Sequence, residues 1–160
     1  MNYTTYEVNV YDNGDKHWHQ NGISHRTDGP ATEYANGDKW WWSNGQIHRD
    51  YGPAMEYAGG DKMWYQNGRP HRNNGPAAEW SHGDKEWYQN GELHRTDGPA
   101  YEGARGSRIW YLNGKMHRTD GPAIVKTNGS KRWFIAGIEL TEVQFNELVA
   151  NLPVLNANLA

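Results

Sequence analysis

The sequence predicts an all-β protein: an elongated, single-layer antiparallel sheet of tandem 23-residue β-hairpin repeats that ends in a short C-terminal capping helix. Asn-Gly or related turn dipeptides occur twice in every period, and such turns between short alternating segments are a strong hairpin signal. The mean hydropathy is −1.05 and the apolar residues are mostly Trp and Tyr, which argues against a thick two-layer core. A tryptophan ladder recurs every 23 residues, as expected for a solenoid whose repeats pack on their neighbours: Trp18, Trp41, Trp64, Trp87, Trp110 and Trp133.

Five complete repeats cover residues 13–127 and follow the consensus N-G-D-K-x-W-Y-Q-N-G-x-x-H-R-x-D-G-P-A-x-E-Y-A. Repeat positions are numbered 1 to 23 from Asn13, so the tryptophan stands at position 6. The two turns, at positions 1–2 and 9–10, flank a short strand, and a longer segment follows at positions 11–22. Because proline lacks an N–H donor, we expect this longer segment to kink at Pro30, Pro53, Pro76, Pro99 and Pro122.

The turn lengths decide the strand register. If both turns are two-residue loops, the tryptophan faces position 13, occupied by His25 and its equivalents, on one neighbouring strand. On the other neighbour it faces position 20, which holds Thr32, Met55, Ala78, Tyr101 and Ile124. A loop one residue longer would move every side chain to the opposite face.

Both ends are predicted to be caps. Residues 1–12 form a half-repeat whose strand alternates from Glu7 to Tyr11. A partial sixth repeat covers residues 128–140, and a capping helix is expected over residues 141–152. Thr141 and Gln144 can form a capping box, and Leu140 and Phe145 a hydrophobic staple. The apolar side of the helix is expected to consist of Val143, Leu148 and Val149. Pro153 is expected to end the helix and leave residues 153–160 as a tail.

The repeat resembles the MORN repeat in its W-x-x-N-G-x-x-H core, and is closer still to the W-Y-x-N-G-x-x-H-R-x-D-G-P-A arrays frequent in phage genomes. The terminal unit of those phage arrays is matched by Trp133, Gly137, Glu139, Leu140, Thr141 and Phe145. The resemblance implies a single-layer hairpin sheet that acts as a docking surface or assembly element. H-R-x-D-G-P-A replaces the H-G-x-G of eukaryotic MORN repeats, so their lipid association is not carried over.

Charge and composition exclude several functional classes. A net charge of −3 and a pI near 6.2 disfavour binding to duplex nucleic acid or to an anionic membrane, since both need a basic surface. The chain has no cysteine and no apolar run long enough to span a bilayer. It also lacks a signal-peptide pattern at its start. We therefore expect a cytoplasmic protein, in the host cytoplasm if a phage encodes it.

Repeated histidines and arginines do not predict an active or metal site. Equivalent residues of adjacent repeats lie two strands apart, roughly 9 to 10 Å, whereas zinc ligands lie about 2 Å from the metal. His17 and His19 are the only pair with chelating spacing, and no third ligand accompanies them. No unique nucleophile and base occur together. We expect no enzyme activity, no cofactor and no metal.

Residues that depart from the repeat are the candidates for binding, because the fold does not dictate them. The partner-binding candidates are Trp40, Trp42, Tyr51, Met55, Met63 and Trp80, which we expect to form an exposed apolar patch. The ligand-binding candidates instead come from the repeated His-Arg columns, whose charge could hold phosphates beside the aromatic rings: His48, His71, His94, Arg49, Arg72 and Arg95.

The predicted function is that of a non-enzymatic interaction protein that binds a protein partner through an aromatic sheet face, such as a phage inhibitor of a host defence protein. One alternative is a sponge that sequesters a nucleotide-like small molecule between rings and arginines. The other is a self-assembling structural scaffold. Homodimerisation through an exposed aromatic face also stays open.

Overall fold

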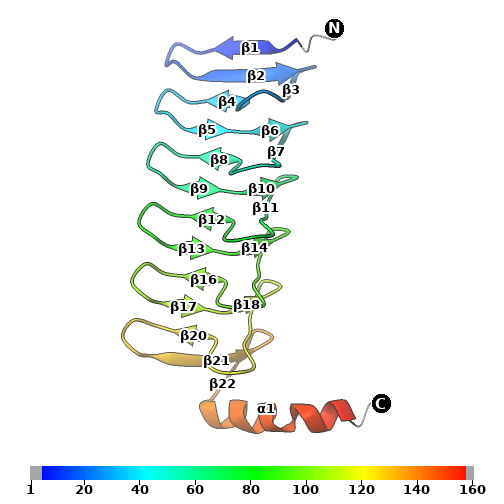
Figure 1. Cartoon of the computed structure of the whole chain (residues 1–160), viewed down its shortest axis with the longest axis vertical. Helices are drawn as coiled ribbons and strands as arrows, with labels where there is room; N and C mark the ends of the chain where they lie inside the picture. The colour runs from blue at the N-terminus through cyan, green and yellow to red at the C-terminus, as the bar shows by residue number, and fades with distance from the viewer. Residues whose placement is uncertain (1–4, 158–160) are drawn as a thin grey trace. The chain divides into compact units, whose positions relative to one another are not determined.

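The structure is a computed structural model that describes residues 5–157, with side chains described for residues 5–151. The chain divides into two compact units, Met1–Gly91 and Glu92–Ala160. Most of its ordered structure is antiparallel β-strand arranged in hairpins, followed by one C-terminal helix, α1 (Glu142–Ala157) (Figure 1). The predicted all-β fold class is confirmed. Among the described residues, no helix is long and apolar enough to cross a membrane.

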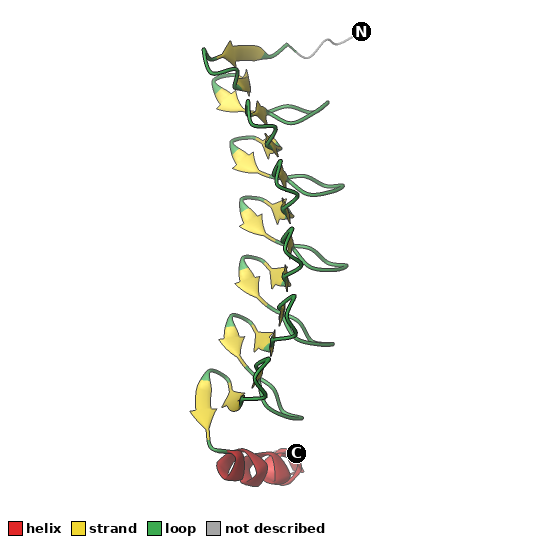
Figure 2. Ribbon diagram, turned by 90° about the vertical axis from the view of Figure 1, so that its left-hand side faces the viewer, coloured by secondary structure: helices red, strands yellow, loops and turns green. Residues whose placement is uncertain are grey.

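Unit 1 contains one antiparallel layer of strands in the order β1-β2-β4-β5-β8-β9-β12-β13, seen edge-on in Figure 2. Its strands are β1 (Glu7–Val10), β2 (Lys16–Gln20), β4 (Thr32–Glu33), β5 (Lys39–Trp40), β8 (Met55–Glu56), β9 (Lys62–Met63), β12 (Ala78–Glu79) and β13 (Lys85–Glu86). Smaller strands branch from this layer: β3 (Ile23–Ser24), β6 (Trp42–Ser43), β7 (Gln46–Ile47), β10 (Tyr65–Gln66), β11 (Arg69–Pro70) and β14 (Tyr88–Gln89). The pairs β6-β7 and β10-β11 are separate hairpins, and β3 pairs with β2.

Unit 2 repeats this plan in the order β16-β17-β20-β21-β22, with β18-β19 as a separate hairpin. Its strands are β15 (Glu92–Leu93), β16 (Tyr101–Glu102), β17 (Arg108–Ile109), β18 (Tyr111–Leu112), β19 (Lys115–Met116), β20 (Ile124–Val125), β21 (Lys131–Ile135) and β22 (Ile138–Leu140).

The ladder tryptophan divides the short strand of each inner repeat in two. The N–H of Trp41 donates to the carbonyl of Ala54 in the sheet (2.8 Å), while its carbonyl accepts from the N–H of His48 in the side hairpin (3.0 Å). The backbone of Trp41 therefore belongs to two strand pairings, one in the main sheet and one in the side hairpin. The chain passes from the first to the second at this residue. The longer segment is also interrupted, because Pro53 lies in a loop between β7 and β8 rather than at a kink within one strand.

The Asn-Gly turn at positions 9–10 has the predicted two-residue form. His19 pairs with Ser24 and Gln20 with Ile23 across the turn. Asn21 and Gly22 have φ values of 53° and 73°, the left-handed pair that a type I′ turn requires. The tryptophan consequently faces position 13, and this half of the predicted register is confirmed by the bond between His48 and Trp41.

The turn at positions 1–2 is longer, so the other half of the predicted register is wrong. Glu33 pairs with Lys39 across a five-residue loop, and Thr32 pairs with Trp40. The loop is lengthened because Asn36 accepts a hydrogen bond from the N–H of Asp38 through its side chain (3.0 Å), forming an Asx turn. Position 20 therefore pairs with position 5, and the tryptophan pairs with the alanine at position 19.

This register gives the sheet two different faces. The ladder face carries the tryptophans with the alanines of position 19, which are fully buried: Ala31, Ala54, Ala77, Ala100 and Ala123. The opposite face, here called the aromatic face, carries positions 5, 7, 20 and 22. Side chains alternate between faces along a strand, so the irregular aromatic residues lie on the side away from the ladder.

The N-terminal strand occupies its predicted place, because β1 pairs along β2 from Glu7 opposite His19 to Val10 opposite Lys16. Val8 and Val10 remain 46% and 67% exposed. The edge strand thus ends the unit 1 sheet while leaving apolar side chains at the surface.

The C-terminal helix begins with the predicted capping box. The N–H of Gln144 donates to Oγ1 of Thr141 (3.2 Å), and the N–H of Thr141 donates to Oε1 of Gln144 (3.0 Å). Phe145 is buried, whereas Val143 is 65% exposed and does not belong to the apolar side, contrary to expectation. The helix also continues through Pro153 to Ala157, so the prediction that Pro153 ends it is wrong.

Replacing Ala77 by Val tests the packing of the ladder face. Ala77 is fully buried, so two extra methyl groups should overpack the site and lower the free energy of unfolding by about 1 to 3 kcal/mol. The matched control is Ala58→Thr, because Ala58 is exposed and Thr127 stands at the equivalent position of another repeat. Urea denaturation measures both variants; equal stability of Ala77→Val and wild type would contradict the assigned register.

Candidate interaction surface

Each repeat is held by an arginine at position 14, here called the clamp arginine. The guanidinium of Arg49 lies 3.8 Å from the ring centroid of Trp41. One of its nitrogens, Nη1, donates to the carbonyl of Pro53 (2.9 Å) and to the carboxylate of Glu56 (2.8 Å). A Cβ at Gly52 would lie 3.2 Å from this guanidinium, so glycine lets the loop pass beneath it. The arginine of position 14 is thus paired with the glutamate of position 21.

The histidines of position 13 join consecutive repeats. Nδ1 of His48 accepts a hydrogen bond from the N–H of Asn67 in the next hairpin turn (3.1 Å). His25, His71 and His117 make the equivalent bond. An accepting Nδ1 places the proton of the neutral ring on Nε2. These histidines therefore have a structural role, and their Nδ1 atoms are engaged within the fold.

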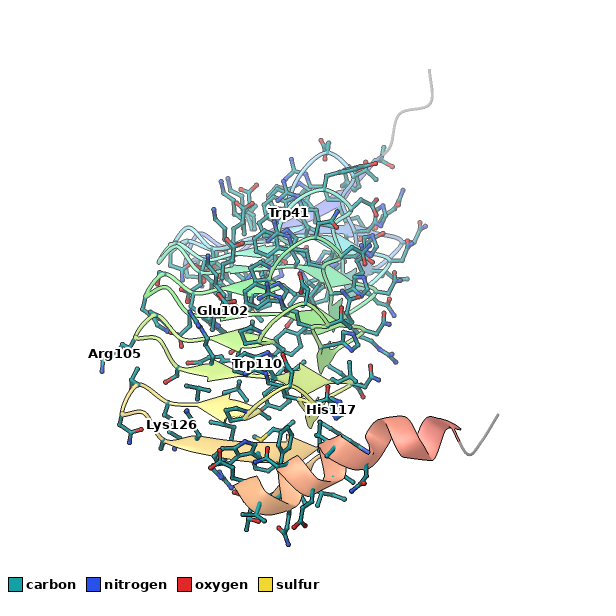
Figure 3. All side chains as sticks on the ribbon, turned by 60° about the horizontal axis from the view of Figure 1, so that its bottom comes forward. Trp41, Glu102, Arg105, Trp110, His117 and Lys126 are labelled. Carbon is teal, nitrogen blue, oxygen red and sulfur yellow. The ribbon has the colours of Figure 1, made fainter. Side chains whose placement is uncertain are left out.

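The aspartates of position 3 join repeats at the opposite turns. Oδ1 of Asp38 accepts from the N–H of Ala58 (2.7 Å), and Asp61 bonds Ser81 in the same way (2.7 Å). The bond within the turn is made by the asparagine of position 1, whose side chain accepts from the N–H of the aspartate. Figure 3 shows the two sides in unit 2, where serine replaces the aspartate of position 3: Arg105 and Lys126 mark the side of the turns at positions 1–2, and His117 marks the side of the hairpins.

The loops after the clamp arginine fall into two types that differ at positions 15 and 16. In the first type these positions are Thr-Asp, and the aspartate accepts a bond from Nε of the arginine at 2.7 to 2.8 Å: Arg26–Asp28, Arg95–Asp97 and Arg118–Asp120. In the second type they are Asp50-Tyr51 or Asn73-Asn74. There the residue at position 15 instead accepts from Nε2 of the histidine, at 3.0 Å for both His48 and His71.

The backbone of the second loop type also differs. The following glycines, Gly52 and Gly75, have φ values of 106° and 121°, in the region that favours glycine. Tyr51 is 90% exposed as a result of its position on this loop. It is the most exposed of the large hydrophobic side chains among the described residues.

An open groove of about 670 Å³ lies between the loops of the first two repeats in unit 1. Its walls include Arg26 and Asp28 on one side and Arg49 and Tyr51 on the other, and Trp42 also lines it. Unit 2 has a corresponding groove of about 540 Å³ between its loops at residues 95–99 and 117–120. That groove has Asp120 where the first has Tyr51, and its lining includes one tryptophan, Trp110, where the lining of the first includes Trp41 and Trp42.

The aromatic face of unit 1 holds a continuous cluster of rings around Trp40. Its ring centroid lies 5.2 Å from that of Tyr34, 6.3 Å from that of Trp42 and 6.4 Å from that of Tyr57. Burial in this cluster raises the pKa of Tyr34 and of Tyr57. Trp40 and Trp42 are half-buried, and within the described chain their indole N–H groups are buried without a hydrogen-bond acceptor.

The predicted partner-binding residues do not form one exposed patch. Met55 is only 6% exposed and pairs across the strands with both Trp40 and Met63, so it supports the rings from within the sheet. Trp80 is half-buried and its ring stacks with His82 at 6.5 Å. Tyr51 lies on the loop beside the groove. The signal missed in the sequence was the pair of residues at positions 15 and 16, which vary together.

The predicted ligand-binding residues also separate. Nε of Arg95 is bonded to Asp97, and Nδ1 of His94 accepts from the N–H of Asn113. Arg49 and Arg72 belong to the second loop type. His17 and His19 stack with ring centroids 6.5 Å apart. In the part of the chain that the structure describes, no three His, Asp or Glu side chains converge as metal ligands.

No protein-family model matches this chain, and no curated protein matches it. The repeat type therefore stays a prediction from the sequence motifs.

Acid should destabilise the fold through the aspartates that join repeats. The N–H of Ser81 holds the pKa of Asp61 below its ordinary value of 3.8, and the N–H of Ala35 does the same for Asp15. A lowered folded pKa stabilises the fold above the unfolded pKa, and this contribution is lost as pH falls through the folded pKa. We expect Asp61→Asn to melt below wild type at pH 7, with the gap shrinking as pH falls below about 4. A gap that is independent of pH in thermal melts would contradict this role.

Proposed function

We propose that this protein is a non-enzymatic interaction module that binds a protein partner through the groove of unit 1. The observation that carries the proposal is Tyr51, a large ring that is 90% exposed at the wall of the groove, where the first loop type has an aspartate. Nothing in the repeat requires this ring, because the other loops are built without it. Exposed tyrosines and tryptophans that surround a concave site are the side chains that most often dominate binding energy at protein interfaces.

The aromatic face supports the same proposal. Trp42 lines the groove, and its ring also contacts that of Trp40 in the cluster on the opposite face, so this one residue links the groove to a half-buried aromatic surface. Aromatic side chains held by strand pairing offer apolar contact area with little loss of conformational entropy on binding. The resemblance of the repeats to phage arrays makes a host protein, such as a defence protein, the first partner to test.

A second candidate is a nucleotide-like ligand, since the groove places Arg26 and Arg49 close to aromatic rings. The clamp weakens this candidate. The guanidinium of Arg49 already covers a face of Trp41 at 3.8 Å, which restricts stacking of a base on that ladder ring. Thermal-shift measurements with ADP test this alternative directly.

Tyr51→Ala should weaken partner binding without changing the stability of the fold. The tagged protein is used to capture partners from a bacterial host lysate, and the dissociation constant is then measured with the purified partner. We expect a loss of at least about tenfold, as for an aromatic residue that dominates an interface. Val143→Ala in α1 is the control, since Val143 is also exposed but lies far from this loop in sequence. Unchanged affinity of Tyr51→Ala with the captured partner would refute the proposal.

A further inference from the structure

The first loop type shows which chemical group fits the outer edge of a clamp arginine. Nε of Arg118 donates to the carboxylate of Asp120 at 2.7 Å, and Nη1 donates to the carbonyl of Pro122. Arg26 binds two carboxylates at once, Asp28 through Nε and Glu33 through Nη1. A clamp arginine in this fold therefore accommodates a carboxylate on its Nε edge while it keeps its glutamate.

Two consecutive repeats lack this internal carboxylate. Tyr51 and Asn74 stand at position 16, and among residues 5–151 no acidic side chain pairs with Nε of Arg49 or of Arg72. Both arginines keep their other contacts, with Nη1 bonded to the proline carbonyl and to glutamate. Their side chains are 29% exposed, against 19% for Arg26. Two guanidinium groups are thus held in place with an edge toward solvent.

We propose that Arg49 and Arg72 bind two carboxylates of an extended acidic segment in a protein partner. Each carboxylate takes the position that aspartate occupies in the first loop type. This inference rests on the proposed function in one respect, that the partner is a protein. Charge-assisted bonds from an arginine already fixed by stacking and hydrogen bonds lose little conformational entropy on binding.

The repeat sets the spacing of the two carboxylates. Equivalent residues in consecutive repeats lie two strands apart, roughly 9.6 Å at about 4.8 Å per strand. A polyproline II segment has three residues per turn and rises about 3.1 Å per residue, so residues i and i+3 face the same side about 9.3 Å apart. The segment therefore carries Asp or Glu at i and i+3. Tyr51 is in the same loop as Arg49, so its exposed ring offers an apolar contact at that end of the segment.

The local charges are compatible with this ligand. Asp50 is the acidic residue nearest in sequence to Arg49, and its carboxylate is bonded to Nε2 of His48. The equivalent residue in the next repeat is the neutral Asn73, bonded to His71. In the second loop type the side chain of position 15 is thus bonded to the histidine and not to the arginine. In the first loop type the arginine Nε donates to the aspartate of position 16.

The test uses a fluorescein-labelled, proline-rich dodecapeptide with glutamates at peptide positions 5 and 8, titrated with the full-length protein and followed by fluorescence anisotropy. We expect saturable binding that weakens as salt is added. A peptide with glutamates at positions 5 and 6, or with glutamine at both sites, should bind at least tenfold more weakly.

Matched variants restore or remove the internal carboxylate. Tyr51→Asp combined with Asn74→Asp places on Arg49 and Arg72 the aspartate that the first loop type carries, and should weaken peptide binding at least tenfold without unfolding the protein. Adding Asp97→Ala and Asp120→Ala to that background removes the internal carboxylates beside Arg95 and Arg118, and should restore binding. Equal peptide affinity of wild type and the Tyr51→Asp/Asn74→Asp variant would overturn the inference.

Other outcomes separate this inference from the proposed function. If Tyr51→Ala abolishes partner binding while Asn74→Asp leaves it unchanged, the interaction module stands and the two-carboxylate ligand is wrong. Peptide binding with the expected spacing, but no partner protein that depends on Tyr51, would support the carboxylate site and count against the proposed function. Absence of peptide binding at 1 mM protein overturns the inference, and ADP binding in its place supports the small-ligand alternative.

Discussion

The clamp arginine is the interaction on which the rest of each repeat depends. The guanidinium of Arg72 lies 3.8 Å from the ring centroid of Trp64 and donates hydrogen bonds to the Pro76 carbonyl and to the Glu79 carboxylate. These contacts join the ladder strand, the proline loop and the following strand, which the short two-residue strands could not hold by backbone bonds alone. The small alanine of position 19 beside the ladder and the glycine beneath the guanidinium both follow from the room that this stack needs.

With the clamp fixed, the loops that follow it can vary without loss of the repeat. The variation occurs at positions 15 and 16, where Thr-Asp satisfies the outer edge of the arginine and Asp-Tyr or Asn-Asn leaves that edge toward solvent. The histidine and aspartate bonds between turns keep neighbouring loops in register. A scaffold of this kind presents side chains at regular intervals, and function depends on which loops depart from the common pattern.

Much of the fold followed from the sequence, because a fixed period with paired Asn-Gly turns allows few alternatives. The capping box at Thr141 and the two-residue turn at Asn21-Gly22 were predicted from local chemistry and are present. The register at the other turn was not, since the Asx turn of Asn36 lengthens the loop and the dipeptide does not reveal this. Because of this shift by one residue, the ladder tryptophan pairs across the strands with the alanine of position 19 and not with position 20, which holds Met55 in one repeat. Of the candidate site, Tyr51 was found as a departure from the repeat, but that it replaces an aspartate bonded to the arginine Nε in other loops required the structure.

A double-mutant cycle between Trp64 and Arg72 tests the central role of the clamp most directly. The free energies of unfolding of Trp64→Leu, Arg72→Met and the double variant are compared with that of wild type by urea denaturation. The account predicts a coupling energy of about 0.5 to 2 kcal/mol, since each single variant already loses the stacked pair. Effects that add within about 0.3 kcal/mol would show that the two side chains stabilise the repeat independently, and would contradict the account.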